Sequence, residues 1–351
     1  MSQADILFEV RGRLGLITLN RPKALNALTT EMCVALRAQL GRWAGDKAID
    51  AVVIQGAGDR AFCAGGDVVA LYESGKAGTA DWREFFASEY RADAAVYHFP
   101  KPYVALIDGI TMGGGVGVSV HGSHRIATER TVFAMPETGL GLFPDVGGSH
   151  FLPRLPGQTG MYLGLTGYRA KAADAIHLGV ANGYVPSERL EALVVRLASV
   201  QLPNAKAVDA IVGEFAADPG DPPVAAHRAL IDRFFTGPGV EAILMQLLAH
   251  GSDWARAQHD TLLRMSPTSL KVAFRQLSEG AGLEFDDCMR MEFRMINRVM
   301  AGHDFYEGVR AIIIDKDKTP RWQPAGLEDV SAADVDAYFA GLDELELDLR
   351  T

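Results

Sequence analysis

The sequence is poor in cysteine and has no long apolar run. Its three cysteines, Cys33, Cys63 and Cys288, are too few and too scattered for a disulfide framework or a zinc site, which indicates a reducing compartment. No apolar stretch approaches the about 20 residues that a membrane-spanning helix requires. The first residues lack the basic region and apolar run of a secretory signal. We therefore expect a cytoplasmic protein, or one that is soluble in an equivalent compartment, and no embedding in a membrane.

The chain also lacks the basic excess that favours nucleic-acid binding. It has 34 Lys and Arg against 44 Asp and Glu, a net charge of −10, which argues against nucleic acid or an anionic membrane as a partner. Hydrophobic residues make up 48% of the 351 residues, a share typical of a folded globular protein. No Walker A segment occurs, and no G-x-G-x-x-G follows a strand. An anionic small ligand stays compatible, because local Lys and Arg residues can dominate one cleft.

Strands and helices alternate in the first half of the chain. Apolar periodicity predicts two strands within 5–19 and further strands at 51–55, 103–107, 125–127 and 131–134. Helical spacing predicts helices that begin at Thr29 or Thr30, over 81–98 and over 115–121. From residue 157 onward the pattern is mostly helical. This order predicts an α/β first part followed by a helical C-terminal part.

Two glycine-rich segments each follow a predicted strand. One spans residues 61–67 (Ala-Phe-Cys-Ala-Gly-Gly-Asp), and the other spans residues 108–117. A strand that runs through glycines into a helix presents free backbone N–H groups at the helix N-terminus. Two such corners side by side could donate two hydrogen bonds to one developing oxyanion. The alternative is that the glycines only permit tight turns and close helix packing.

Two acids lie eight residues apart in an apolar segment. Glu137 and Asp145 are surrounded by apolar residues, Gly and Pro. An acid in such surroundings is costly unless it is paired or used in catalysis. The alternative is helix capping, which suits Asp145 because a helix is predicted to begin near Gly147. Capping suits Glu137 less well, so Glu137 is the stronger candidate for a catalytic group.

Two other side chains resemble nucleophiles but fit packing roles better. Ser119 lies inside a predicted helix, and the Gly117-Val-Ser-Val-His121 segment lacks the final glycine of a nucleophile elbow. Cys63 has no neighbouring base or cation that would lower its pKa. His121 and His124 have no third metal ligand nearby in the sequence. We therefore interpret all four as structural residues.

Four segments resemble signatures of the crotonase (enoyl-CoA hydratase/isomerase) superfamily. These segments are 21–28 (Arg-Pro-Lys-Ala-Leu-Asn-Ala-Leu), 62–67, 108–117 and 304–310 (Asp-Phe-Tyr-Glu-Gly-Val-Arg). Their order and spacing agree with the family over most of the chain. The resemblance implies the crotonase fold, a spiral of β-β-α units. We expect this core, with the coenzyme A site and the active site, in residues 1–200, and a helical region in residues 201–351.

The residues at the two positions of the hydratase glutamates indicate which members of the family the chain resembles. Hydratases of the family use two glutamates, and this chain has Gly117 at the first position and Glu137 at the second. A hydratase holds water between two carboxylates that exchange acid and base roles, so Gly117 puts hydration in doubt. Segments similar to those of the family's 3-hydroxyisobutyryl-CoA hydrolases are 110–117, 134–148, 266–271 and 314–318. The resemblance thus implies hydrolysis of 3-hydroxyisobutyryl-CoA, a step of valine catabolism.

The resemblance also implies roles for individual residues. The backbone N–H groups of Gly66 and Gly114 would form an oxyanion hole. Glu137 would attack the thioester carbonyl or activate water, and Asp145 would orient the substrate hydroxyl or the water. Glu89 would lie near the acyl group, although a surface position fits its sequence context nearly as well. The residues expected to bind coenzyme A are Lys23, Asn26, Ala27, Ala64, Gly65, Gly66 and Asp67, with Lys316 and Lys318 as further candidates for its phosphates.

The expected ligand is an acyl-CoA, and the resemblance implies no metal or redox cofactor because coenzyme A enters as part of the substrate. A homo-oligomer is compatible with the family. Two alternatives stay open. One is an enoyl-CoA hydratase or isomerase that works with Glu137 alone, which hydration of crotonyl-CoA would reveal. The other is a crotonase-like protein that binds acyl-CoA without turnover, which tight binding without product release would reveal.

Overall fold

The computed structural model describes residues 4–349, and the chain divides into two compact units. Unit 1 comprises Met1–Gly66, Arg91–Phe133 and Arg169–Ala225, and unit 2 comprises Asp67–Tyr90, Ala134–Tyr168 and Ala226–Thr351. The boundary predicted at residue 200 falls within the third segment of unit 1. The division into residues 1–200 and 201–351 therefore does not coincide with these units, and it stays a prediction.

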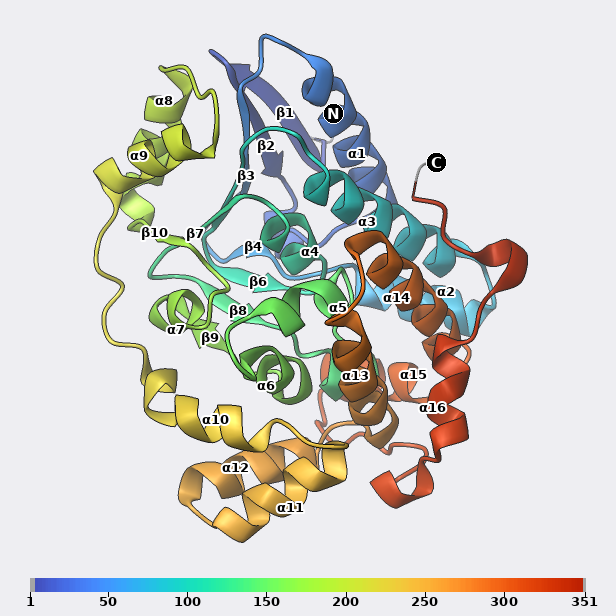
Figure 1. The fold of residues 1–351 in the computed structure, drawn as a ribbon. Helices are drawn as coiled ribbons and strands as arrows, with labels where there is room; N and C mark the ends of the chain where they lie inside the picture. Colours follow the sequence, from blue (N-terminus) through green and yellow to red (C-terminus); the bar gives the residue numbers. More distant parts are fainter. Residues whose placement is uncertain (1–3, 350–351) are drawn as a thin grey trace. The chain divides into compact units, whose positions relative to one another are not determined.

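Unit 1 contains a six-stranded sheet in the order β1-β2-β3-β5-β7-β10 (Figure 1). The strands are β1 (Ile6–Arg11), β2 (Leu14–Leu19), β3 (Ala51–Gly56), β5 (Tyr103–Ile107), β7 (His124–Ala127) and β10 (Gly183–Tyr184). β1 and β2 are antiparallel, and the other neighbours are parallel. Every residue of β5 is buried, as expected for a central parallel strand. The strands predicted within 5–19 and at 51–55 and 103–107 are confirmed.

Two helices of unit 1 pack on this sheet. α8 (Leu190–Ala198) and α9 (Ala205–Phe215) contact each other, and their apolar side chains join those of the strands in one core. Leu193 and Ile211 from the helices meet Leu16, Val53 and Leu106 from the sheet in this core. Burial of one such side chain stabilises the fold by about 1.5–3 kcal/mol. The apolar runs of the sequence therefore account for the position of both helices.

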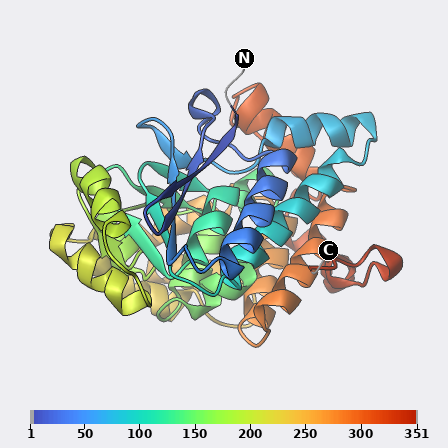
Figure 2. The same cartoon turned by 90° about the horizontal axis from the view of Figure 1, so that it is seen from above.

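Helix α1 (Thr30–Gly45) begins where the sequence predicts. The Thr29 side chain accepts a hydrogen bond of 3.3 Å from the Met32 N–H and so caps the helix. The helix lies alongside the β1–β2 hairpin (Figure 2), and Trp43 packs edge-on against Phe8 with ring centroids 6.1 Å apart. A capped amphipathic helix is thus fixed on the hairpin by an aromatic pair.

A second sheet, with the order β4-β6-β8-β9, carries the glycine-rich corners. Its strands are β4 (Ala61–Cys63), β6 (Ile110–Met112), β8 (Val132–Ala134) and β9 (Ala170–Lys171), and all of their residues except Ala134 belong to unit 1. α4 (Gly114–Val120) follows β6, and α7 (Ala172–His177) follows β9. β8 was predicted, whereas β4, β6 and β9 are too short to show a period in the sequence.

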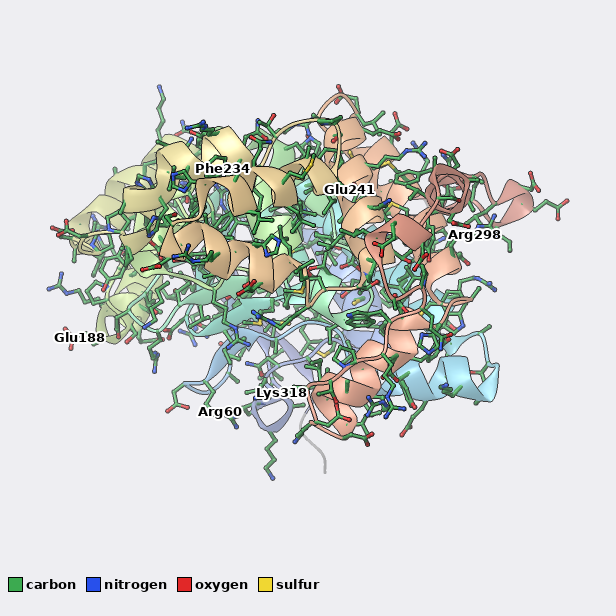
Figure 3. All side chains as sticks on the ribbon, turned by 90° about the horizontal axis from the view of Figure 1, so that it is seen from below. Arg60, Glu188, Phe234, Glu241, Arg298 and Lys318 are labelled. Atoms are coloured by element: carbon green, nitrogen blue, oxygen red, sulfur yellow. The ribbon has the colours of Figure 1, made fainter. Side chains whose placement is uncertain are left out.

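Unit 2 is mainly helical. Its helices are α2 (Val68–Ala77), α5 (Gly148–Phe151), α6 (Thr159–Thr166), α10 (Arg228–Phe234), α11 (Val240–His250), α12 (Asp253–Leu262), α13 (Pro267–Gly280), α14 (Phe285–Val299), α15 (Asp304–Val309) and α16 (Ala332–Phe339). α3 (Asp81–Tyr97) begins in unit 2 and ends in unit 1. Glu241 of α11, labelled in Figure 3, forms an ion pair of 2.7 Å with Lys271 of α13. Within residues 4–349, no helix combines the length and apolar character needed to cross a membrane.

Candidate active site

The two glycine-rich corners lie side by side in unit 1. β4 and β6 are parallel neighbours, with Cys63 opposite Thr111. A Cβ atom on Gly65 would lie 3.7 Å from the backbone nitrogen of Gly114. Gly114 is the first residue of α4, so its N–H has no acceptor within that helix. The structure thus brings the two corners together, and the oxyanion hole of Gly66 and Gly114 stays a prediction.

Close packing explains the glycine at the start of α4 and the roles of two rejected nucleophiles. A Cβ atom on Gly115 would overlap the Cys63 carbonyl oxygen and lie 2.8 Å from the Cys63 Cβ. The Cys63 thiol donates to the Gly65 carbonyl at 3.6 Å. The buried Ser119 hydroxyl donates to the Gly115 and Val116 carbonyls at 2.7 and 3.0 Å. Cys63 and Ser119 are therefore structural residues, as the sequence predicts.

Gly117, the position where the resemblance implies a glutamate in hydratases, is closely packed. A Cβ atom on Gly117 would overlap the Asp93 carboxyl oxygen and lie 2.7 Å from its Cγ. Asp93 of α3 is fully buried, so its carboxyl group cannot swing into solvent. A side chain at residue 117 would therefore require the buried Asp93 carboxyl group to move.

Three predicted acids are buried in unit 2. Glu89 on α3 is 2% exposed, and Glu137 and Asp145 are each 4% exposed. Glu137 begins the 3₁₀ turn η2 (Glu137–Leu140). Within residues 4–349, neither Oε1 of Glu89 nor Oε2 of Glu137 has a hydrogen-bond partner. The surface position considered for Glu89 is wrong, and two buried carboxyl oxygens are left for a ligand to satisfy.

Burial and mutual repulsion favour the protonated forms of these acids. Burial raises the pKa of Glu89 and of Glu137 well above the usual range, and the charge of Asp145 raises both pKa values further. Burial also raises the pKa of Asp145, to about 7, although a hydrogen bond from Tyr90 opposes the rise. A pKa near neutrality, as burial gives Asp145, suits a group that exchanges protons with a substrate or water. Within residues 4–349, no group of three or more His, Cys, Asp or Glu is placed to hold a metal ion.

Tyr90 is a site residue that the sequence analysis missed. Its buried hydroxyl donates a hydrogen bond of 3.1 Å to Oδ2 of Asp145. The sequence analysis placed Tyr90 within the helix predicted over 81–98 and gave it no role. A tyrosine on the buried side of a helix needs a partner for its hydroxyl, which is the signal that could have identified it.

Glu292 is the second missed residue, and it corrects the capping alternative for Asp145. The N-cap of α5 is Gly147, and Asp145 does not cap this helix with its side chain. Instead, Glu292 of α14 accepts hydrogen bonds from the Gly147 and Ser149 N–H groups at 2.8 and 2.9 Å, and from the Ser149 hydroxyl. Glu292 lies on the buried face of α14 beside Met289, so an acid on an apolar stripe is the signal that could have identified it.

The segment around Asn26 lies against the first glycine corner in unit 1. The Leu28 N–H donates to the Gly65 carbonyl at 2.9 Å, and the Ala64 N–H donates to the Leu25 carbonyl at 3.0 Å. The Asn26 amide donates to the carbonyls of Ala57 and Ala61, both at 2.9 Å, and its carbonyl accepts from the Arg21 N–H. Asn26 therefore fixes the main chain of this corner.

The structure assigns no coenzyme A contact to the predicted residues, so these roles stay predictions. Lys23 is exposed in a 3₁₀ turn, and Lys316 and Lys318 are exposed in unit 2. Asp67 accepts a hydrogen bond of 3.4 Å from the Ala70 N–H and caps α2. This cap gives Asp67 a structural role in addition to the predicted one.

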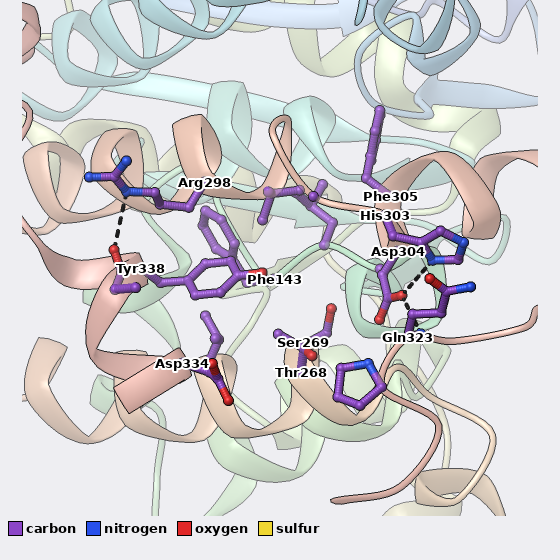
Figure 4. A pocket seen from close by; sticks show the side chains of 17 residues that line it. Phe143, Thr268, Ser269, Arg298, His303, Asp304, Phe305, Gln323, Asp334 and Tyr338 are labelled. Atoms are coloured by element: carbon purple, nitrogen blue, oxygen red, sulfur yellow. Dashed lines mark hydrogen bonds and ion pairs between the residues drawn. The ribbon is translucent and has the colours of Figure 1, made fainter. Parts of the chain in front are cut away.

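A pocket of about 340 Å³ lies in unit 2 but does not contain the buried acids. It is lined by Gly141 and Phe143 and by residues of α13 to α16 (Figure 4). Asp304 in this pocket accepts hydrogen bonds from the Ser266 hydroxyl at 2.6 Å and from the Gln323 N–H at 2.9 Å. Because its acid is satisfied by the protein itself, this pocket is a weaker candidate for catalysis than the buried acids.

The sequence matches one protein family and a set of curated proteins. Residues 14–339 match the family model described as enoyl-CoA hydratase/isomerase. The chain is 50% identical to a zebrafish (Danio rerio) protein over 99% of this chain and 92% of that protein, and 44% identical to a human protein over 98% and 90%. Both relatives are named "3-hydroxyisobutyryl-CoA hydrolase, mitochondrial".

Two solved structures match almost the whole chain. One is a carnitinyl-CoA dehydratase from Mycobacterium thermoresistibile, with a TM-score of 0.92, 41% identity and 99% coverage of both chains. The other is an enoyl-CoA hydratase from Rhodobacter sphaeroides, with a TM-score of 0.88, 38% identity, and coverage of 98% of this chain and 100% of that chain. The predicted crotonase fold is confirmed.

The expected cytoplasmic location is wrong, because the curated relatives are named as mitochondrial proteins. The prediction rested on the small number of cysteines and on the absence of long apolar runs. The sequence analysis took both features as signs of a reducing aqueous compartment. They do not distinguish one such compartment from another, so they could not identify the cytoplasm.

Proposed function

Because the chain belongs to the enoyl-CoA hydratase/isomerase family, we propose that it hydrolyses 3-hydroxyisobutyryl-CoA to 3-hydroxyisobutyrate and coenzyme A. Relatives that are 44–50% identical over nearly the whole chain carry the name of this activity. The acyl-CoA is accordingly the ligand of the chain. Among the segments that pointed to hydrolysis in the sequence, residues 134–148 contain the buried acids Glu137 and Asp145.

The observation that carries the proposal is the set of buried carboxyl groups with free oxygen atoms. Oε1 of Glu89 and Oε2 of Glu137 are buried and have no hydrogen-bond partner within residues 4–349. A buried polar atom that stays unsatisfied destabilises the protein by about 1–3 kcal/mol. The hydroxyl of a 3-hydroxyacyl group is a donor that would satisfy Glu89. Oε2 of Glu137 would accept a hydrogen bond from a water molecule or would lie beside the thioester carbonyl carbon.

The proposed chemistry needs two backbone N–H donors and one carboxyl group. In unit 1, the N–H groups of Gly66 and Gly114 supply the oxyanion donors, and one such donor typically lowers the barrier by about 3 kcal/mol. In unit 2, Glu137 either attacks the carbonyl carbon and expels the coenzyme A thiolate, or takes a proton from the attacking water. Asp145 orients the substrate hydroxyl or the water. The first route passes through a mixed anhydride that water then cleaves.

Oxygen-18 tests whether water cleaves an anhydride at the Glu137 carboxyl carbon. The enzyme turns over its substrate in ¹⁸O-labelled water, and mass spectrometry then follows the peptide that contains Glu137 and the product acid. Label in the Glu137 carboxyl group supports the anhydride route. Label that enters only the product acid counts against attack of water on a Glu137 anhydride carbon.

The alternative function is hydration of an enoyl-CoA, the activity named for one solved relative. Gly117 argues against it, because residue 117 carries no carboxyl group and a side chain there would overlap Asp93. The test offers 3-hydroxyisobutyryl-CoA and crotonyl-CoA to the same preparation. Thiol release from the first without loss of the double bond of the second supports the hydrolase. Hydration of crotonyl-CoA without thiol release would identify a hydratase.

Three further parts of the proposal have simple tests. The reaction needs no metal or redox cofactor, so prolonged chelation should leave the rate unchanged.

A homo-oligomer is compatible with the family, and light scattering tests it. The proposal includes no binding to nucleic acid or membranes, which sedimentation with DNA or anionic vesicles tests. The activity serves valine catabolism, so cells that lack it should accumulate 3-hydroxyisobutyryl-CoA when they are supplied with valine.

A further inference from the structure

Asp145 is followed by a turn that is unfavourable for its sequence. Val146 has φ +52° and Gly147 has φ +83°, so both residues are left-handed. Glycine adopts this conformation readily, but a β-branched residue such as valine rarely does. The surrounding structure must therefore hold Val146 in place. This turn fixes the direction in which the Asp145 side chain leaves the main chain.

Two long side chains hold the main chain on either side of Asp145. On the C-terminal side, Oε2 of Glu292 accepts the Gly147 N–H, and Oε1 accepts the Ser149 N–H and hydroxyl. On the N-terminal side, the Gln276 amide donates a hydrogen bond of 2.6 Å to the Pro144 carbonyl. Glu292 and Gln276 are both fully buried. The two side chains also approach each other, with 3.5 Å between the Gln276 nitrogen and Oε1 of Glu292.

The chemical types of the two side chains match their targets. Backbone N–H groups at the start of a helix lack acceptors within the helix, and the N-cap residue Gly147 has no side chain that could accept them. A carboxyl group with two oxygens satisfies two such donors at once. The Pro144 carbonyl needs a donor, which the amide of Gln276 supplies. Each group would be left unsatisfied if its partner were replaced by an apolar residue.

We propose that Glu292 and Gln276 are positioning residues that hold residues 144–149 as a clamp and thereby aim the Asp145 carboxyl group at the substrate. The proposal rests on the proposed function, because it assigns the clamp to the role of Asp145 in hydrolysis. Tyr90 then completes the arrangement by fixing Oδ2 of Asp145 through its hydroxyl. The main chain and the side chain of Asp145 are thus held by different residues.

A double-mutant cycle tests the clamp. Glu292→Gln keeps the size of the side chain but leaves one acceptor oxygen where the turn uses two. We expect kcat to fall by 10-fold or more with a smaller change in KM. If Glu292 acts through Asp145, the same change in an Asp145→Asn background should cost less than threefold. An equal loss in both backgrounds would overturn the proposal, because a merely structural residue lowers the rate whether or not Asp145 is present.

Asp174→Asn is the matched control. Asp174 of unit 1 is also a buried acid that accepts a main-chain hydrogen bond, from the Val224 N–H at 2.9 Å. Any effect of this substitution on kcat should be the same with and without Asp145. If Glu292→Gln does not fold, Gln276→Leu replaces it in the cycle, since it removes the donor to Pro144 without a change of charge. The same two outcomes then support or overturn the clamp.

Amide hydrogen exchange separates failure of the clamp from failure of the proposed function. If the wild type releases no thiol from 3-hydroxyisobutyryl-CoA, the proposed function is wrong, but exchange can still be measured. The clamp predicts at least 10-fold faster exchange in residues 145–151 of Glu292→Gln and unchanged exchange there in Asp174→Asn. Unchanged exchange in residues 145–151 of Glu292→Gln would overturn the clamp, whatever the activity.

Discussion

At the scale of single residues, one hydroxyl group sets the ionisation of Asp145. Burial raises the pKa of Asp145 to about 7, and the hydrogen bond from Tyr90 at 3.1 Å stabilises the ionised form against that rise. A hydrogen bond to the charged form of an acid lowers its pKa. Tyr90 therefore keeps part of the Asp145 population ionised near neutral pH.

Tyr90→Phe should move the pH–rate profile to higher pH. Without the hydroxyl, no hydrogen bond from residue 90 lowers the pKa of Asp145. Burial then raises this pKa further, so a higher pH is needed to ionise Asp145. We expect the rising limb of kcat/KM to shift by about one pH unit, which equals about 1.4 kcal/mol. Tyr103→Phe is the control, because it removes a buried hydrogen bond of 3.0 Å to the Val118 carbonyl and leaves Asp145 alone. A profile that stays in place in Tyr90→Phe would exclude this role.

The sequence predicts individual acids better than it predicts their partners. Glu137 and Asp145 stand out because acids are costly among apolar residues, and both are buried. Glu89 was ambiguous, because an acid on an amphipathic helix belongs equally well to the exposed face. Tyr90 and Glu292 were missed because their partners are distant in sequence. A hydrogen bond between remote segments leaves no local pattern, although polar atoms on apolar helix faces are a usable signal.

At the scale of elements, α4 packs so closely that it tolerates only glycine at two positions. Cβ atoms on Gly115 and Gly117 would overlap the Cys63 carbonyl and the Asp93 carboxyl group, respectively. Both contacts lie within unit 1. The close approach of α4 to β4 is what brings the second glycine corner beside the first. The functional and the packing interpretations of these glycines are therefore compatible.

Gly117→Ala should destabilise the protein by about 1–3 kcal/mol, because the added methyl group overpacks the contact with Asp93. Gly41→Ala is the matched control, since Gly41 lies in α1 with no atom within 4 Å of a Cβ position. Alanine there should stabilise the helix by about 0.5–1 kcal/mol. Urea unfolding measures both changes. Equal unfolding midpoints for the wild type and Gly117→Ala would show that residue 117 has room for a side chain.

Elements with a strong local pattern were predicted closely. The β1–β2 hairpin, β3, β5 and the capped helix α1 match their apolar patterns and their turn or cap residues. β4, β6, β9 and β10 have two or three residues each, and pairing with neighbouring strands defines them. The division into units was not predicted either, because each unit is assembled from three separate segments.

At the scale of the whole molecule, the buried acids make stability depend on pH. Burial raises the pKa of Glu292 to about 8 and that of Asp145 to about 7, and it raises the pKa values of Glu89 and Glu137 as well. In the unfolded chain these acids titrate at about 4. The folded protein therefore binds more protons than the unfolded chain between about pH 4 and pH 8. Stability is lost as the pH rises through the folded-state values.

We expect Tm to fall between pH 5 and pH 8, because the four acids keep more protons on the folded protein than are lost at His150 and His124. Burial lowers the pKa of both histidines, which opposes the slope only up to about pH 6.5. The hydrogen bond with Arg310 lowers the pKa of Glu307 to about 2, so Glu307 stabilises the fold fully above pH 5. It therefore does not change the dependence of Tm on pH in this range. Glu292→Gln removes one of the raised groups, so its Tm should change less steeply with pH than that of the wild type. Differential scanning calorimetry from pH 5 to pH 8 measures both slopes. A wild-type Tm that rises over this range would contradict the assignment of raised pKa values.

The central claim is that Glu137 drives hydrolysis of a 3-hydroxyacyl-CoA, and thiol release measures it most directly. Purified wild type and Glu137→Gln are mixed with 3-hydroxyisobutyryl-CoA, and free coenzyme A is followed with a thiol reagent. We predict rapid release by the wild type and a loss of at least about 100-fold in the variant, the usual effect of removing a catalytic acid or base. Equal release by both proteins, or none by the wild type, would contradict the account.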